Sequence, residues 1–223
     1  MKNSKFIFII SFLILAAMLN VYSSYAYSAV GTSLSTALNI AGINITQNQS
    51  NSGHDLEYDI KAAFLYNFIK FIDWPEINDI NDTEKLIIGV IGKNNFGDAF
   101  KPVQDKKVKG KDTVIKYFKS FSELEKNKEE YAKTSEEILK CHLIFISSSE
   151  KDYISKILNI VDKKSILTVG ETKNFLKDGG IINFVLEENK VRFEINLIAA
   201  KQSDLTIRSQ LLRLAKSVIE EKK

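Results

Sequence analysis

Strand-like runs alternate with helix-like segments through the middle of this sequence, and this alternation constrains the fold more than any other feature. The runs occupy residues 86–92, 112–118, 143–147 and 166–170. Short, mainly apolar runs are typical of strands that are covered on both faces. Strands that are joined by helices pair in parallel, through right-handed crossovers, between two helix layers. The sequence therefore predicts an α/β fold with a mostly parallel central sheet.

The pattern changes after Gly179-Gly180, which interrupts the chain. Residues 181–186 and 190–196 are two further strand-like runs. The residues between them are suited to a tight turn, with Asn189 at a positive φ. We therefore expect the sheet to end in an antiparallel hairpin.

Helices are predicted around these strands. The first is capped by Asp55, carries an apolar face that includes Ile72, and stops before Trp74-Pro75 because the residue before proline disfavours helical geometry. Ser122 and Glu125 resemble a capping box that opens a long charged helix to residue 139. Further helices are expected over 95–100, 151–161 and 197–202, followed by an extended segment over 205–207 and a C-terminal helix capped by Ser209.

The N-terminus has the order of a secretory signal. Lys2 and Lys5 precede an apolar stretch over residues 6–19, and Ser24-Tyr25-Ala26 resembles a cleavage site. The alternative, an uncleaved membrane anchor, requires about 20 apolar residues, and this stretch is shorter. We expect residues 1–26 to be a signal peptide, cleaved near Ala26, and the mature protein to work outside the cytoplasm.

A polar, uncharged segment follows the expected signal. Residues 27–53 are rich in Ser, Thr, Asn, Gln and Gly and contain no Asp, Glu, Lys or Arg. A segment of this composition buries too little apolar surface to offset the entropy of ordering. We expect a flexible tether over 27–54, followed by a single domain over 55–223.

The charge balance argues against a nucleic-acid partner. The chain has 31 basic and 28 acidic residues, and the signal peptide takes only Lys2 and Lys5 from these. A nucleic-acid-binding protein shows a strong basic excess on one face. We therefore expect no nucleic acid among the partners.

No combination of residues predicts catalysis or metal binding. His54 and His142 have no partner at metal-ligand or triad spacing. Gly89, Gly92 and Gly97 match neither the dinucleotide-binding fingerprint nor the P-loop, and a plain strand-to-helix turn explains them. We expect no catalytic residue, no metal and no cofactor.

Cys141 is the only cysteine, and it precedes the apolar run 143–147. In an exported protein an odd thiol is either buried or joined to another chain. We favour burial because free cysteine is among the most buried residue types, and an intermolecular disulfide is the alternative. A dyad with His142 is sterically disfavoured, since adjacent strand residues point to opposite faces.

The arginines are concentrated at the C-terminal end. Of the 31 basic residues, only three are arginine: Arg192, Arg208 and Arg213. In a chain that otherwise uses lysine, arginine indicates positions where a planar fork of donors is useful, for a carboxylate, a phosphate or a protein interface. These three positions are therefore candidates for a binding surface.

Polar faces of two predicted elements contain these arginines. In the strand 190–196, Arg192, Glu194 and Asn196 share one face, and an Arg192–Glu194 ion pair is the alternative explanation for two of them. On the C-terminal helix, Gln210 and Arg213 lie away from an apolar stripe, and plain solvation is the alternative there. The stripe comprises Leu211, Leu214, Ala215 and Val218.

Longer motifs run through residues 61–215. They are KAAFLYNFIKFIDWP (61–75), IGVIGKNNFG (88–97), VKGK (108–111), CHLIFI (141–146), LTVGE (167–171), GGIINF (179–184), VRFEIN (191–196) and LTIRSQLLRLA (205–215). In the content and order of these motifs the sequence resembles the YfiR family (YfiR/HmsC-like) of periplasmic regulators.

The resemblance implies a three-layer Rossmann-like sandwich that forms a homodimer and is not an enzyme. It also implies that the protein binds the periplasmic sensor domain of a membrane-bound diguanylate cyclase and represses it, which lowers cyclic-di-GMP signalling and biofilm formation. The resemblance and the polar faces together give the candidate partner-binding or ligand-binding residues as Phe184, Arg192, Glu194, Asn196, Arg208, Gln210 and Arg213.

A second function fits the same exported domain: a periplasmic small-molecule sensor that feeds another membrane receptor, such as a histidine kinase. A neighbouring cyclase gene would favour the first function and a neighbouring kinase gene the second. Relatives whose inhibition depends on intramolecular disulfides need paired cysteines, so the lone Cys141 excludes control through an internal bridge here.

The expected export is tested at the mature N-terminus. Native protein should begin near Tyr27, because the signal peptide is removed after Ala26. N-terminal sequencing of the protein from periplasmic extract measures this. Recovery of the unprocessed chain from the cytoplasm would show that the N-terminal segment is not a signal.

Overall fold

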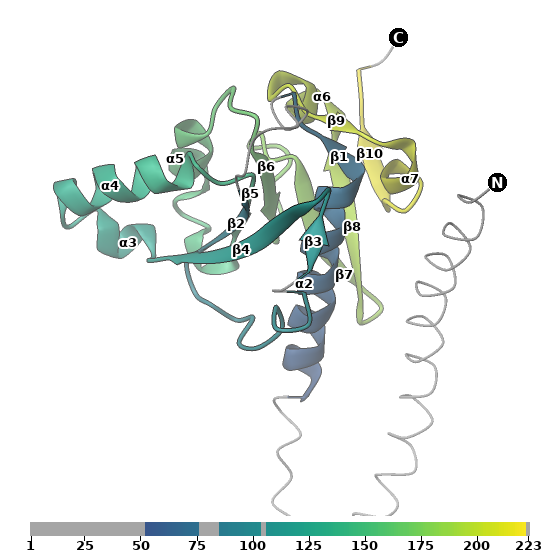
Figure 1. Ribbon diagram of the computed structural model, residues 1–223, viewed down its shortest axis with the longest axis horizontal. Helices are drawn as coiled ribbons and strands as arrows, with labels where there is room; N and C mark the ends of the chain where they lie inside the picture. The colour runs from purple at the N-terminus through teal and green to yellow at the C-terminus, as the bar shows by residue number, and fades with distance from the viewer. Residues whose placement is uncertain (1–51, 76–84, 104–105, 222–223) are drawn as a thin grey trace, which may run out of the picture. The chain divides into compact units, whose positions relative to one another are not determined.

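The computed structural model describes residues 52–75, 85–103 and 106–221 (Figure 1). The expected signal peptide and nearly all of the expected tether lie outside the described residues. The first described element is helix α2, Ser52–Phe71, which starts three residues before the expected cap at Asp55.

A sheet of eight strands forms the centre of the domain, in the order β10-β8-β7-β6-β5-β2-β4-β3. Two neighbouring pairs, β7–β8 and β3–β4, are antiparallel, and the others are parallel. The predicted α/β fold with a mostly parallel sheet and an antiparallel hairpin is confirmed. The strands are β2 (Leu86–Ile91), β3 (Lys107–Val108), β4 (Lys111–Phe118), β5 (Leu143–Ile146), β6 (Leu167–Gly170), β7 (Ile182–Glu187), β8 (Lys190–Asn196) and β10 (Ser217–Ile219).

Helices cover both faces of the sheet. Figure 1 shows α3 (Phe121–Leu124), α4 (Lys128–Ile138) and α5 (Ile154–Ile160) gathered on one side, away from α2. Strand β5 shows why two layers form: Leu143 and Phe145 belong to the core beneath α2, whereas Ile144 and Ile146 belong to the core beneath α3 to α5. Alternate side chains of a strand point to opposite faces, so a strand without polar residues needs cover on both.

Aromatic rings join α2 to the hairpin. Phe68 of α2 stacks on Phe184 of β7 with ring centroids 5.7 Å apart, and it meets Phe193 of β8 edge to face at 5.1 Å. Phe64, one turn earlier, contacts the same two rings at 6.0 and 5.4 Å. Such pairs contribute about 0.5–1.5 kcal/mol each beyond the burial of their area. They fix α2 over the hairpin end of the sheet.

The segment after α2 corrects the predicted helix end. Ile72 does not continue the helix: Ile72–Asp73 forms β1, which pairs antiparallel with β9, Thr206–Ile207. Ile72 is nevertheless fully buried, as an apolar face would require. Residues 95–100 form turns rather than the expected helix, with Phe96 and Phe100 buried against each other.

The long charged helix is also divided, and the predicted capping box is wrong. Helix α3 is capped by Ser120, whose hydroxyl accepts a hydrogen bond from the backbone N–H of Ser122. A new helix, α4, starts at Lys128 and is capped by Asn127, whose side-chain oxygen accepts hydrogen bonds from the backbone N–H groups of Glu129 and Glu130. An asparagine in this role satisfies donors that the first helical turn leaves unpaired.

The predicted C-terminal helix is only one turn long. Helix α6 (Leu197–Gln202) forms as expected, but α7 spans Ser209–Leu212 and follows Arg208 rather than a Ser209 cap. The apolar stripe does not exist as a helix face, since Val218 lies in strand β10 and Leu214 is exposed. The outer edge of β8 offers unpaired backbone groups, and the β-branched Val218 and Ile219 favour pairing with it over a longer helix.

Cys141 lies just before β5 and is buried, as expected. Burial raises the pKa of its thiol from an ordinary value of 9.0 to about 12, an effect that Lys116 opposes and Glu137 assists. The thiolate is the reactive form of cysteine, so the folded protein holds little of it near neutral pH.

The burial of Cys141 predicts slow thiol chemistry. A thiol reagent added at neutral pH should label the folded protein far more slowly than the urea-unfolded protein, because the buried thiol stays protonated. Reduction should leave the oligomeric state unchanged, as size-exclusion chromatography would show. Rapid labelling, or a dimer that dissociates in reductant, would contradict the buried interpretation and favour an intermolecular disulfide.

Candidate functional site

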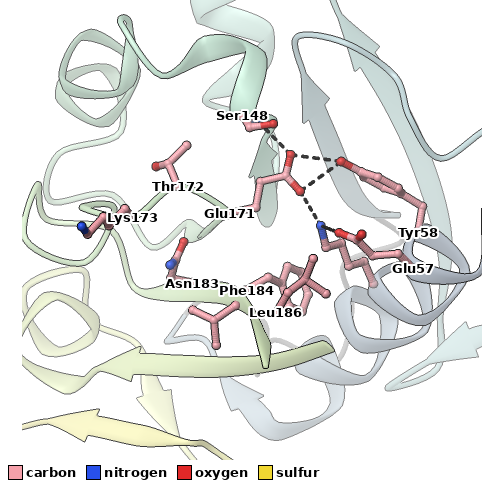
Figure 2. Close-up of a pocket in the computed structure, with 11 residues that line it drawn as sticks. Glu57, Tyr58, Ser148, Glu171, Thr172, Lys173, Asn183, Phe184 and Leu186 are labelled. Atoms are coloured by element: carbon pink, nitrogen blue, oxygen red, sulfur yellow. Dashed lines mark hydrogen bonds and ion pairs between the residues drawn. The ribbon is translucent and has the colours of Figure 1, made fainter. Parts of the chain in front are cut away.

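A cavity of about 530 Å³ opens at the carboxyl ends of β5 and β6, beside the first turns of α2 (Figure 2). Ligands of open α/β sheets bind outside the carboxyl ends of the strands, where loops of different strands converge. The residues that line this cavity come from α2, the loops after β5 and β6, and strand β7. They are Glu57, Tyr58, Lys61, Ser148, Glu171, Thr172, Lys173, Asn183, Phe184, Val185 and Leu186.

Glu171 is the centre of a hydrogen-bond network in this cavity. It directly follows Gly170, the last residue of β6, so its carboxylate projects from the end of a buried strand. The carboxylate accepts the ammonium of Lys61 at 2.6 Å, the hydroxyl of Tyr58 at 3.1 Å and the backbone N–H of Ser148 at 2.8 Å. Figure 2 shows these groups converging on it from α2 and from the loop after β5.

Lys61 is a buried cation whose charge is matched within the chain. Its side chain is only 4% exposed, and it forms ion pairs with Glu171 and, one helical turn earlier, with Glu57. Its ammonium also lies 4.5 Å from the centre of the Tyr58 ring, within reach of a cation–π interaction. A buried lysine is retained only when paired and hydrogen-bonded, and both conditions are met here.

Tyr58 extends the network to the loop after β2. Its hydroxyl donates to Glu171 and accepts a hydrogen bond from the side-chain amide of Asn95 at 2.9 Å. Burial raises the pKa of Tyr58 well above its ordinary value, and the neighbouring Glu171 charge raises it further. The phenol therefore stays neutral and remains a donor at every physiological pH.

Two buried polar groups of the cavity wall lack partners. The side-chain oxygens of Asn183 and Thr172 are buried and have no hydrogen-bond partner among the described residues. Asn183 is only 3% exposed, and it lies on β7 opposite Glu194 of β8. Native proteins pair nearly all such groups, so each exception calls for an explanation.

A second crevice, between β2 and β5, is filled by the protein itself. The chain leaves β2 for β4 on one side and returns to β5 on the other, which is the arrangement that creates a nucleotide site in many α/β folds. Here the fully buried Glu150 accepts the backbone N–H of Phe121 at 2.9 Å and the hydroxyl of Ser149 at 2.9 Å. A Cβ at Gly92 would lie 2.5 Å from this carboxylate. The glycine loop therefore faces a carboxylate, which disfavours a phosphate.

Of the seven residues predicted for binding, only Phe184 touches the cavity. Asn196 is occupied within the fold: its oxygen accepts the N–H of Ala199 at 3.0 Å and its amide donates to the carbonyl of Leu176 at 3.0 Å. Glu194 accepts the hydroxyl of Ser217 at 3.0 Å. Among the described residues, no ion pair joins Glu194 to the exposed Arg192, so that alternative is not what the structure shows.

The other three predicted residues lie together at α7. Arg208 forms a forked contact with Asp73 of β1, with nitrogen-to-oxygen distances of 2.6 and 2.9 Å. This contact lowers the pKa of the Asp73 carboxyl, chiefly through the hydrogen bonds from Arg208. Gln210 and Arg213 are exposed, at the surface of α7 and immediately after it. The structure therefore separates an α7 surface from the cavity.

Sequence patterns did not single out Lys61, Glu171 or Asn183 as residues of a site. A signal was present for Glu171, because it follows a buried strand at the edge where α/β proteins place their sites. Lys61 offers no comparable signal, because the first helix also contains Asp55, Glu57, Asp59 and Lys70. Whether the Asn183 oxygen finds a hydrogen-bond partner depends on its tertiary surroundings, so no sequence pattern indicates that it lacks one.

The fold and the cavity define an α/β sandwich domain with a small polar cavity, whose described residues include no group of three or more His, Cys, Asp or Glu suited to a metal. Residues 58–216 match the family model described as YfiR/HmsC-like, and the chain belongs to this family. The family comprises non-catalytic periplasmic regulators of diguanylate cyclase systems. None of the helices that the structure describes has the length and hydrophobicity of a membrane span.

Similar solved structures include two bacterial proteins. One is the ABC domain from Streptococcus pneumoniae in complex with L-Trp, at 13% identity and a TM-score of 0.48, covering 71% of this chain and 60% of that chain. The other is a conserved domain protein from Vibrio cholerae, at 12% identity and a TM-score of 0.48, covering 72% and 60%. This chain thus spans about 60% of the length of each. No curated protein matches the chain.

The network predicts a large loss of stability when its carboxylate is removed. Glu171→Gln should lower the free energy of unfolding by about 3 kcal/mol, because it leaves the buried Lys61 with one charged partner. Urea unfolding measures this. The matched control is Asp98→Asn, which removes an ion pair between Asp98 and Lys101 whose side chains are 78% and 69% exposed. That change should cost no more than about 0.5 kcal/mol. Equal losses would show that Glu171 is not an anchor of the fold.

Proposed function

We propose that this protein binds the periplasmic sensor domain of a membrane-bound diguanylate cyclase and represses the enzyme. Cyclic-di-GMP and biofilm formation then stay low until the restraint is lifted. The observation that carries the proposal is the match of residues 58–216 to the YfiR/HmsC-like family of cyclase regulators. The expected signal peptide supports it, because the partner domain lies in the same compartment.

The α7 surface is the best candidate for the contact with the cyclase. Arg213 is exposed and lies next to Leu214, an apolar side chain that is 48% exposed. Arginine with adjacent apolar surface is typical of the residues that dominate protein interfaces. The surface is also held rigidly, because Leu211 is buried and Arg208 contacts two elements. Its side chain binds Asp73 of β1, and its backbone N–H donates to the carbonyl of Phe71, the last residue of α2, at 2.9 Å. Rigid presentation reduces the entropy that binding must overcome.

Repression requires a preference between two states of the cyclase. A binding protein without catalytic groups shifts an enzyme only by binding its inactive state more tightly than its active state. Each tenfold difference in affinity corresponds to about 1.4 kcal/mol. A few well-placed contacts from the α7 surface are sufficient for a regulatory shift of this size.

Arg213→Glu tests the α7 surface. The change should leave the stability of the domain within about 0.5 kcal/mol of the wild type, because the side chain is exposed. Binding to the cyclase's periplasmic domain should weaken by about 2 kcal/mol or more if the arginine is a desolvated anchor. Cells that carry the variant should resemble a deletion, with raised cyclic-di-GMP and thicker biofilm. Calorimetry on the purified domains and cyclic-di-GMP quantification give the two readouts.

The control is Lys128→Glu, a change of equal charge at an exposed position. Lys128 lies on α4, which packs on the opposite face of the sheet from α2. Wild-type binding in this variant and loss of binding in Arg213→Glu would support the α7 surface. Equal weakening of cyclase binding in both variants would show that the loss comes from long-range electrostatics and not from a contact at α7. Normal cyclic-di-GMP in both variants, with high cyclic-di-GMP in the deletion, would place the contact elsewhere on the domain.

A further inference from the structure

The polar cavity beside Glu171 has the size and lining of a ligand site. Its volume of about 530 Å³ lies within the range of about 300–1,000 Å³ that small-molecule sites occupy. We propose that it binds a small uncharged molecule that carries several hydroxyl or amide groups, of the size of a monosaccharide. Such binding does not require the cyclase, so its failure and the failure of cyclase binding are separate results.

The charges of the cavity exclude an ionic ligand. Lys61 is already shared between Glu57 and Glu171, which leaves no buried cation available for a ligand anion. A ligand cation near Glu171 would compete with Lys61, whose side chain is 4% exposed and would lose one of its two carboxylate partners. Lys173 is exposed to solvent at the rim, where water screens its charge. A neutral ligand disturbs none of these pairs.

The unpartnered groups of the cavity indicate what the ligand must offer. The Asn183 oxygen accepts hydrogen bonds, and the Thr172 hydroxyl both donates and accepts. In Figure 2 both residues lie across the cavity from Tyr58, in the wall that a ligand between the two sides would face. Two of the four such buried atoms found in the described residues line this one cavity. A ligand with adjacent hydroxyl or amide groups satisfies both.

Strand β7 supplies an apolar side to the same cavity. Val185 and Leu186 line it, and Leu186 is 60% exposed, although large apolar side chains are usually covered. Binding sites for small molecules combine such apolar surface with a few placed polar groups. The carbon-bound hydrogens of a sugar ring or polyol chain would cover this side, while its hydroxyl groups face Asn183 and Thr172.

Titration calorimetry on the purified mature protein tests the proposal with defined probes. Glucose and N-acetylglucosamine represent neutral polyhydroxyl compounds, and glucuronate and protonated glucosamine are their respective charged counterparts. At least one neutral probe should bind, and its charged counterpart should bind at least tenfold more weakly. Tighter binding of the charged forms, or no binding of any neutral probe at about 10 mM, would overturn the proposal, since that concentration largely fills a site with a Kd near 1 mM.

Two variants test whether the binding occurs in the cavity, and a third serves as the control. Asn183→Leu and Thr172→Val should each weaken the bound neutral probe at least tenfold, while urea unfolding shows unchanged or higher stability, because an unpartnered polar group is removed. The matched control is Thr113→Val, which removes a buried, unpartnered hydroxyl from β4, outside the cavity. Unchanged affinity in the control supports the site. Unchanged affinity in Asn183→Leu, or equal loss in Thr113→Val, would overturn it.

Discussion

The buried ion pair between Lys61 and Glu171 is the interaction on which the rest of this structure depends. It joins the first helix to the end of a central strand, two segments separated by 110 residues in sequence. A charge at this depth is tolerated only with a partner, so the pair specifies one position of α2 over the sheet. With α2 in that position, Phe68 meets the rings of the β7–β8 hairpin, and the core on this face closes.

The same pairing decides what the domain offers to other molecules. The acidic and basic groups at the carboxyl end of the sheet are used for structure: Glu171 holds Lys61, and Glu150 holds the start of α3 beside Gly92. The places where this fold class binds charged nucleotides therefore present occupied carboxylates. Neutral groups such as Asn183 remain in the cavity wall, and the exposed Arg208 and Arg213 lie elsewhere, at the two ends of α7.

The YfiR/HmsC-like family is regulatory and non-catalytic, and a protein that acts by binding benefits from a stable surface. The forked contact from Arg208 to Asp73 ties the short α7 turn to the strand that follows α2 and so holds the α7 surface in place. Because the ion pair fixes α2 and Asp73 follows directly after it, the α7 surface and the cavity are attached to the same rigid helix. A change at either place thus acts on a common element of the fold.

The sequence by itself determined the four central parallel strands and the hairpin, because burial on both faces imposes apolar runs and a tight turn needs a residue such as Asn189, which has a φ of 59°. It also determined that Cys141 is buried and which family the motifs resemble. Only the tertiary structure decided the C-terminal segment, because Val218 extends as a strand in response to the open edge of β8, a feature outside the segment itself. It likewise decided that Lys61 pairs with Glu171 and that the Asn183 oxygen has no hydrogen-bond partner. Both outcomes depend on neighbours that are distant in sequence and close only after folding.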